Sequence, residues 1–175
     1  MRTDETKPFI PMNIAVLTVS DTRTPDDDRS GNTLVALLEE AGHRKAARSI
    51  VADDAALLRA EVSGWIANPE IDAVLTTGGT GFTGRDVTPE ALTPLFDKHI
   101  EGFAIVFHMI SYQKIKTSTI QSRACAGVAN GTYIFCLPGS PSACRDGWNE
   151  ILKFQLDNRH RPCNFAEIMP RLKEV

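Results

Sequence analysis

The chain has 175 residues, of which 42% are hydrophobic and 23% are charged. This length corresponds to one domain of ordinary size, and the composition is that of a globular protein rather than a disordered chain. The 19 basic and 22 acidic residues give a net charge of −3, so the basic footprint typical of nucleic-acid-binding proteins is absent.

The first residues of the chain, its short apolar runs and its cysteines predict a cytoplasmic protein. Residues 1–12 carry charges where a signal peptide would need an apolar core, and they predict a flexible arm. No apolar run approaches the roughly 20 residues of a membrane span. The four cysteines lack paired zinc spacing, which favours idle thiols in a reducing cytosol.

The first half of the domain alternates between strand and helix patterns. Strands are predicted from short apolar, partly β-branched runs over 13–20 and 71–77, and a further strand is predicted over 44–51, where the first half of the run is polar. Ser30 is predicted to cap a helix over 31–41. Asp53 or Asp54 is predicted to cap a second helix, which Asn68-Pro69 ends.

The second half continues with helices and one hairpin. Thr88 is predicted to cap a helix with Pro89 at its first position, and a further helix is predicted over 102–112. Asn130-Gly131 predicts a tight turn between strands 124–129 and 132–137. Ser140 is predicted to cap a last helix, and residues 157–175 form a tail expected at a subunit contact.

This order predicts an α/β protein. Strands that alternate with helices favour a mostly parallel sheet covered on both faces, here with an antiparallel hairpin strand. The predicted fold is therefore a three-layer α/β/α sandwich, with the domain over residues 13–156.

Three loops follow strands in this arrangement and carry the candidate site. They are Ser20–Arg23, Gly78–Asp86 and Pro138–Ser142. Because ligands of open α/β sheets bind outside the carboxyl ends of the strands, we expect these loops to converge on one edge.

The second of these loops is rich in glycine. Gly78, Gly79 and Gly81, with Thr80 between them, leave backbone N–H groups open to a phosphate, although a tight turn without a ligand is an equally consistent interpretation. Asp86 and Asp53 suit Mg²⁺ as hard oxygen ligands, but helix capping also explains both.

Other features of the sequence narrow the chemistry further. Arg23, Arg85 and Arg123 are the cations available for phosphate contacts near these loops. The signatures of Rossmann dinucleotide sites, P-loops, serine hydrolases and zincins are missing.

Five motifs occur in one order along the chain: Thr18–Asp21 (TVSD), Thr76–Gly81 (TTGGTG), Arg85–Glu90 (RDVTPE), Ser122-Arg123 and Leu137–Ser140 (LPGS). With this set, the chain resembles the molybdopterin-binding proteins of molybdenum cofactor biosynthesis over about residues 13–156. The arm and the segment Arg161–Phe165 are more similar to the cofactor biosynthesis protein B branch than to the adenylyltransferase branch.

The resemblance implies a reaction and a set of residues for it. ATP and molybdopterin would give adenylylated molybdopterin and pyrophosphate with Mg²⁺, in a homotrimer or hexamer. The two acidic residues that matter in the family fall on Asp53 and Asp86, as catalytic residues and Mg²⁺ ligands. Contacts to nucleotide, pterin or phosphate would come from Ser20, Asp21, Gly78, Gly79, Thr80, Gly81, Ser122, Arg123, Pro138, Gly139 and Ser140.

Two other hypotheses remain open from the sequence. A non-catalytic molybdopterin-binding or carrier protein would bind the pterin tightly without turning over ATP. A structural oligomer with a vestigial pocket would bind neither ligand. The sequence favours the adenylyltransferase because both acidic positions are retained.

Overall fold

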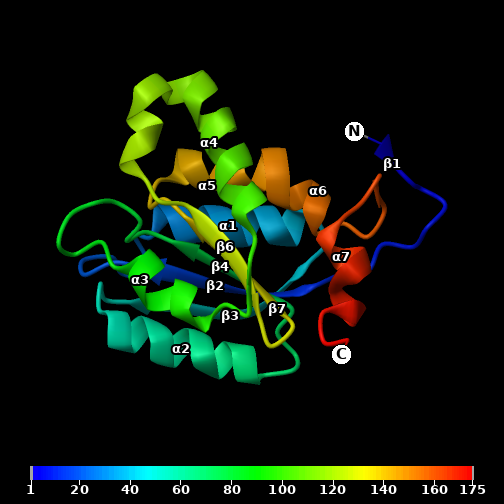
Figure 1. The fold of residues 1–175 in the computed structure, drawn as a ribbon, viewed down its shortest axis with the longest axis horizontal. Helices are drawn as coiled ribbons and strands as arrows, with labels where there is room; N and C mark the ends of the chain where they lie inside the picture. The colour runs from blue at the N-terminus through cyan, green and yellow to red at the C-terminus, as the bar shows by residue number, and fades with distance from the viewer. Residues whose placement is uncertain (1, 175) are drawn as a thin grey trace.

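In the computed structural model, which describes residues 2–174, a six-stranded sheet lies between two layers of helices (Figure 1). This confirms the predicted three-layer α/β sandwich. The elements are β1 Arg2–Thr3, β2 Asn13–Val19, α1 Arg29–Glu40, β3 Arg44–Val51, α2 Ala55–Ala67, β4 Ala73–Thr77, α3 Thr88–Leu92, η1 Thr93–Leu95, β5 Lys98–His99, α4 Glu101–Ile115, η2 Lys116–Gln121, β6 Cys125–Ala129, β7 Thr132–Leu137, α5 Pro141–Gly147, the π-helical η3 Trp148–Leu152, α6 Lys153–Gln155, β8 His160–Arg161, α7 Phe165–Ile168 and η4 Met169–Arg171.

The order of the strands in the sheet includes a point at which successive strands are added on opposite sides of β2. The order is β3-β2-β4-β7-β6-β5, in which β3, β2, β4 and β7 are parallel, β6 pairs antiparallel with β7, and β5 pairs antiparallel with β6. The chain leaves β2 toward one edge through α1, then crosses back through α2 to β4. Strand order therefore reverses between β2 and β4, which is where open α/β sheets bind ligands.

Alternating residues of the central strands build a separate core on each face of the sheet. Ile14 and Val16 of β2 pack in the cluster that α1, α4 and α5 cover, whereas Ala15 and Leu17 pack in the cluster under α2 and α3. Figure 1 shows these two helical layers above and below the sheet. A strand buried on both faces explains the continuous apolar run of β2.

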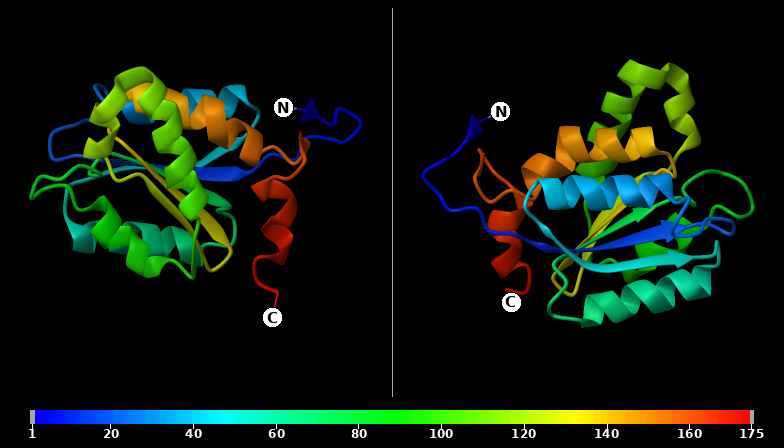
Figure 2. Two further views of the ribbon diagram at one scale, coloured as in Figure 1. Left: turned by 45° about the horizontal axis from the view of Figure 1, so that its top comes forward. Right: turned by 180° about the vertical axis from the view of Figure 1, so that it is seen from behind.

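The segment before β2 contacts the tail of the chain. β1 pairs antiparallel with β8, and the Asn158 side chain contacts two arm residues, donating to Pro8 O and accepting from Ile10 N. β1 and α7 lie at the end of the molecule opposite the carboxyl ends of the parallel strands (Figure 2). The mobility of the arm and the domain boundaries stay predictions.

The start of α1 corrects the prediction that Ser30 caps this helix. Asp28 is the N-cap and accepts a hydrogen bond from Gly31 N at 3.0 Å, so the helix begins at Arg29 rather than Gly31. The Ser30 hydroxyl points back to the Asp28 carboxylate at 3.3 Å. The Asp28 carboxylate, which is also paired with Arg48 of β3, therefore caps the helix in place of Ser30.

Two further boundaries differ from the prediction. Val87 rather than Thr88 is the N-cap of α3, because the Thr88 hydroxyl donates to Gly78 O at 2.9 Å instead of capping the helix. α4 runs over Glu101–Ile115, longer than the predicted 102–112, and β4 begins at Ala73 rather than Ile71.

Other local predictions are confirmed. Asn130 and Gly131 have φ angles of 47° and 82°, as a two-residue hairpin turn of this type requires, and they join β6 to β7. Asp54 is the N-cap of α2, and Ser140 caps α5 by accepting from Ala143 N at 3.1 Å.

Candidate functional site

The three predicted loops meet at the carboxyl ends of β2, β4 and β7. Gly78 N donates to Leu137 O at 3.1 Å, and Gly139 lies so close to Gly78 that an added methyl group would be 3.1 Å from Gly78 Cα. A methyl group on Gly78 would overlap the carbonyl oxygen of Val19, the last residue of β2. The glycines therefore allow three strand ends to pack against one another at the point of strand reversal.

Gly79 brings the backbone close to a carboxylate. Its φ of 63° lies in the left-handed region, and an added methyl group would lie 3.2 Å from Asp53 Oδ1 and overlap the Thr88 hydroxyl. Gly79 O also accepts from Thr88 N at 2.9 Å. The turn is held from both sides, by α3 and by the loop that precedes α2.

Asp21 links the first loop to the other two. Its carboxylate forms a two-pronged ion pair with the Arg85 guanidinium at 2.7 and 3.0 Å, and it accepts from Asp53 N at 3.1 Å. The pKa of Asp21 lies below its ordinary value because Arg85 stabilises the charged form. The structure thus brings Asp21, Asp53 and the Gly78–Asp86 loop together.

The surroundings of Asp53 favour the neutral form of its carboxyl group. Its pKa is raised, first because the side chain is partly buried and second because the Asp21 carboxylate is near, with a smaller contribution from Asp86. Arg85 acts in the opposite direction. Negative charge is therefore concentrated at this point, and a bound cation would relieve it.

Asp86 lies at the end of the glycine-rich loop and folds back onto it. Burial raises its pKa, but hydrogen bonds from Thr83 and from the Gly81 N–H outweigh burial, and the pKa of Asp86 lies below its ordinary value. Thr83 N donates to Asp86 Oδ2 at 2.8 Å. A methyl group on Gly81 would lie 2.8 Å from the same oxygen, so glycine is needed for this approach.

The remaining predicted residues lie around the same edge, and most already have structural partners. Ser20 Oγ accepts from Thr22 N and Arg23 N at 3.2 Å, and Thr77 Oγ1 donates to Pro138 O at 3.0 Å. Thr80 is buried, whereas Ser122 and Ser140 are partly exposed. Their contact with a ligand stays a prediction.

Each of the three arginines proposed for phosphate contact has a carboxylate partner. Arg23 pairs with Asp27, Arg85 with Asp21, and Arg123 with Glu90. The arginines would therefore have to leave a partner to reach a phosphate.

Asp53 and Asp86 fit a magnesium ion. Mg²⁺ is commonly held by one or two carboxylates together with substrate phosphates. Within residues 2–174, no group of three or more acidic, histidine or cysteine side chains is arranged to hold a metal by protein ligands alone. Two carboxylates beside the glycine-rich turn match the first kind of site.

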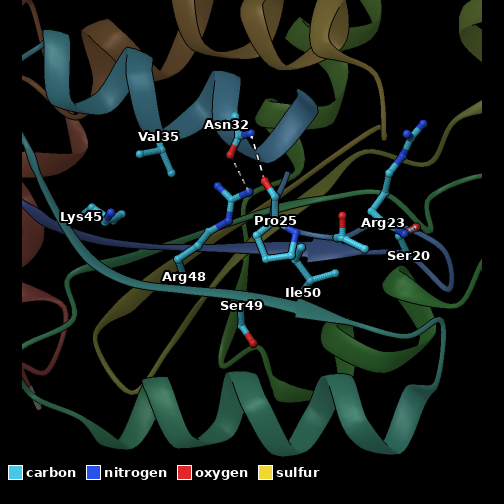
Figure 3. Close-up of a pocket in the computed structure, with 10 residues that line it drawn as sticks. Ser20, Arg23, Pro25, Asn32, Val35, Lys45, Arg48, Ser49 and Ile50 are labelled. Carbon is cyan, nitrogen blue, oxygen red and sulfur yellow. Dashed lines mark hydrogen bonds between the residues drawn. The ribbon is translucent and has the colours of Figure 1, made fainter. Parts of the chain in front are cut away.

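A cavity of about 600 Å³ lies beside the first loop, between α1 and the edge strand β3 (Figure 3). Ser20, Arg23 and Arg48 line it, and Arg48 pairs with the fully buried carboxylate of Asp28. Sequence reasoning missed this pair. The run of three aspartates before α1 was a signal that one of them caps the helix.

Comparison with known proteins agrees with this geometry. The family model for a probable molybdopterin binding domain matches residues 15–158. Molybdenum cofactor biosynthesis protein B of Escherichia coli (strain K12) is 53% identical over 166 residues, which cover 95% of this chain and 96% of the relative. The chain belongs to the molybdenum cofactor biosynthesis protein B family. Membership gives it a role in molybdenum cofactor biosynthesis.

Other members of this family extend the similarity in sequence and in structure. The protein of Bacillus subtilis (strain 168) is 46% identical over 138 residues, covering 78% of this chain and 81% of the relative. A crystal structure of a molybdenum cofactor biosynthesis protein B superposes with a TM-score of 0.87 at 37% identity, covering 97% of this chain and all of that one. The tungsten cofactor synthesizing protein MoaB of Pyrococcus furiosus has a TM-score of 0.74 at 32% identity, covering 94% and 98%.

Proposed function

We propose that the chain binds molybdopterin and adenylylates it with Mg-ATP, releasing pyrophosphate. The observation that carries the proposal is that Asp53 and Asp86 each lie against a glycine of the same turn, at the point where strand order reverses. The family resemblance supports the same assignment. It also supports assembly as a homotrimer or hexamer. We further propose a cytoplasmic location.

The proposed reaction does not need a general base from the protein. An oxygen of the terminal phosphate of molybdopterin attacks the α-phosphorus of ATP, and the bond to the β-phosphate oxygen breaks, so that pyrophosphate leaves with the electron pair. The attacking phosphate is already ionised at pH 7, so the protein must chiefly position the reactants. In the Gly78–Gly81 turn, the N–H groups of Gly78 and Gly81 already donate to Leu137 O and to the Asp86 carboxylate, so those of Gly79 and Thr80 would hold phosphates. Asp53 and Asp86 would hold Mg²⁺, which would neutralise the charge that builds up on pyrophosphate.

The test is product formation from purified protein, molybdopterin, Mg²⁺ and ATP labelled at the α-phosphate. We expect label in the pterin product and an equal amount of pyrophosphate. Asp86→Asn should lower turnover about a hundredfold, because a charged ligand of the metal is lost. Asp146→Asn, which changes an acid paired with Lys114 away from the site, should leave turnover unchanged.

A folded protein that forms no product from intact molybdopterin would contradict the proposal. Calorimetry on the same sample then separates the alternatives. Tight molybdopterin binding without turnover assigns a carrier role, and binding of neither ligand leaves a structural role.

A further inference from the structure

We propose that Arg123 is a positioning residue that closes the Gly81–Asp86 turn and thereby fixes the Asp86 carboxylate, instead of contacting a phosphate. The resemblance implied a ligand contact for this residue. The positioning role rests on the proposed function only where it concerns turnover, since the contacts that hold the turn are independent of any reaction.

The guanidinium of Arg123 spans the two ends of the turn. Nε donates to Gly81 O at 2.9 Å and Nη2 donates to Asp86 O at 3.0 Å. The backbone N–H of Arg123 donates to Thr80 O at 2.8 Å. A planar group with donors in fixed directions is suited to holding two carbonyl oxygens at a set separation.

The charge of Arg123 is also compensated within the protein. Nη1 pairs with the Glu90 carboxylate, whose pKa lies below its ordinary value mainly because of this hydrogen bond. The guanidinium carbon lies 5.2 Å from the centre of the Phe82 ring, a distance at which cation and ring attract each other. Backbone carbonyls, a carboxylate and a ring therefore surround the group that a phosphate would need to reach.

The other hydrogen bonds that hold this turn lie within it, from the Gly81 N–H and from Thr83 to the Asp86 carboxylate. Residues 82–85 are exposed, and a methyl group added to Gly84 would meet nothing within 4 Å. Inside the turn, Thr83 N donates to Asp86 Oδ2 and Asp86 N donates to Thr83 O at 3.0 Å. Arg123 lies outside the turn and joins its two ends, so the place of the Asp86 carboxylate depends on Arg123 as well as on the bonds within the turn.

Hydrogen exchange of the turn, measured by mass spectrometry on the full-length protein without ligands, tests the inference directly. In Arg123→Lys, a single ammonium cannot hold both carbonyls, and the amides of Gly81–Asp86 should exchange roughly ten to a hundred times faster, as expected when charged hydrogen bonds are lost. Arg59→Lys is the matched control. Arg59 donates to Glu90 O and Ala91 O of α3 but not to the turn, so exchange of Gly81–Asp86 should stay unchanged.

Unchanged exchange of the turn in Arg123→Lys would overturn the inference, whatever happens to activity. If the lysine variant does not fold, as judged by circular dichroism, Arg123→Gln is measured by the same criterion. Since exchange needs no substrate, this result stands even if the wild-type protein proves inactive and the proposed function fails.

A kinetic measurement separates positioning from phosphate contact where turnover is present. A positioning role predicts that Arg123→Lys lowers kcat and raises the Mg²⁺ concentration needed for half-maximal rate, with the KM for ATP changed less than threefold. A direct phosphate contact predicts a raised KM for ATP, because lysine is a weaker two-pronged partner. The second pattern would overturn the inference.

Discussion

At the scale of single residues, the acids of the candidate site differ in the direction in which their pKa values are shifted, and their spacing along the chain does not predict this difference. Asp21 is stabilised in its charged form by Arg85, whereas the pKa of Asp53 is raised by burial and by the charge of Asp21. Pairs of acids whose environments push their pKa values apart are frequent at functional sites. The raised pKa of Asp53 also makes its charge, and hence any metal affinity, sensitive to acid.

The effect of Asp21 on Asp53 can be measured directly. In Asp21→Asn, a neighbouring negative charge is lost and Arg85 is released from its partner, and both changes favour the charged form of Asp53. We expect the pKa of Asp53 to fall, as followed by carbon-13 chemical shifts of the carboxyl group during a pH titration without Mg²⁺. A pKa that does not move, in a folded variant, would show that Asp21 does not contribute to the raised pKa of Asp53.

His43 gives the fold a dependence on pH. The ring is buried between Phe9 and Trp148, and its Nδ1 accepts a hydrogen bond from Met12 N at 3.1 Å. Burial lowers the pKa of His43 to about 4, although the charge of Asp157 acts in the opposite direction. A folded-state pKa below the unfolded value of 6.5 means that this group's contribution to stability is complete above pH 6.5 and is lost as the pH falls toward 4.

We therefore expect His43→Gln to have a flatter stability profile in acid. A shift from 6.5 to about 4 corresponds to roughly 3 kcal/mol of unfolding free energy, and glutamine can still accept from Met12 N without titrating. Urea unfolding at pH 7, 5.5 and 4, at one protein concentration, measures the difference between the two proteins. Parallel profiles would contradict the prediction.

At the scale of elements, Asp28 and Asp54 are the N-caps of α1 and α2, but they differ in how many elements their carboxylates contact. Asp28 has no exposed surface and accepts hydrogen bonds from Thr18 Oγ1 at 2.6 Å and from Gly31 N, besides its ion pair with Arg48. Asp54 is exposed and accepts only from the first turn of α2, at 2.8 and 3.0 Å. The first links α1 to β2 and β3, and the second caps its own helix.

Removing each carboxylate should separate these roles. Asp28→Ala leaves Arg48 without its buried partner and should lower the unfolding free energy by about 3 to 5 kcal/mol. Asp54→Ala should lower it by about 1 kcal/mol, the usual value for an exposed N-cap. The comparison uses urea unfolding of both variants under one condition, and equal losses would show that capping alone accounts for Asp28.

At the scale of the whole molecule, α4 and η2 form an apolar surface. Its most exposed apolar residues are Ile105, Met109, Tyr112, Ile115 and Ile120, with exposed fractions from 48% to 72%. α4 projects beyond α1 and α5 (Figure 2). A contiguous apolar face of this kind marks an interaction surface. Within residues 2–174, no helix is both long and apolar enough to cross a membrane.

If the proposed homo-oligomer forms, we expect it to use this face. Met109→Glu places a charge at its centre and should shift the protein toward the monomer in sedimentation velocity, without loss of helical content. Leu57→Glu, which changes an exposed apolar residue of α2 on the opposite face of the sheet, is the control and should keep the wild-type mass. An unchanged mass in Met109→Glu would exclude a central role for this face.

The sequence by itself determined the elements whose causes are local. The Asn130-Gly131 turn follows from backbone angles that these two residues tolerate, and the strands follow from short apolar runs. The alternation of strands and helices predicted the layers, and the sheet's carboxyl edge predicted that Asp21, Gly79 and Asp86 lie near one another. These inferences need only the neighbours of each residue along the chain and the general rules of sheet topology.

Only the tertiary structure decided which distant partner each polar side chain takes. Asp28 became the cap of α1 because Arg48, twenty residues away, pairs with it in the folded protein. The Thr88 hydroxyl donates to Gly78 O instead of capping α3 as predicted. The Arg123 guanidinium donates to carbonyls of a loop that begins about forty residues earlier. The physical reason is that a buried donor or acceptor must find a partner among the groups that packing brings near it, and sequence distance does not limit that choice.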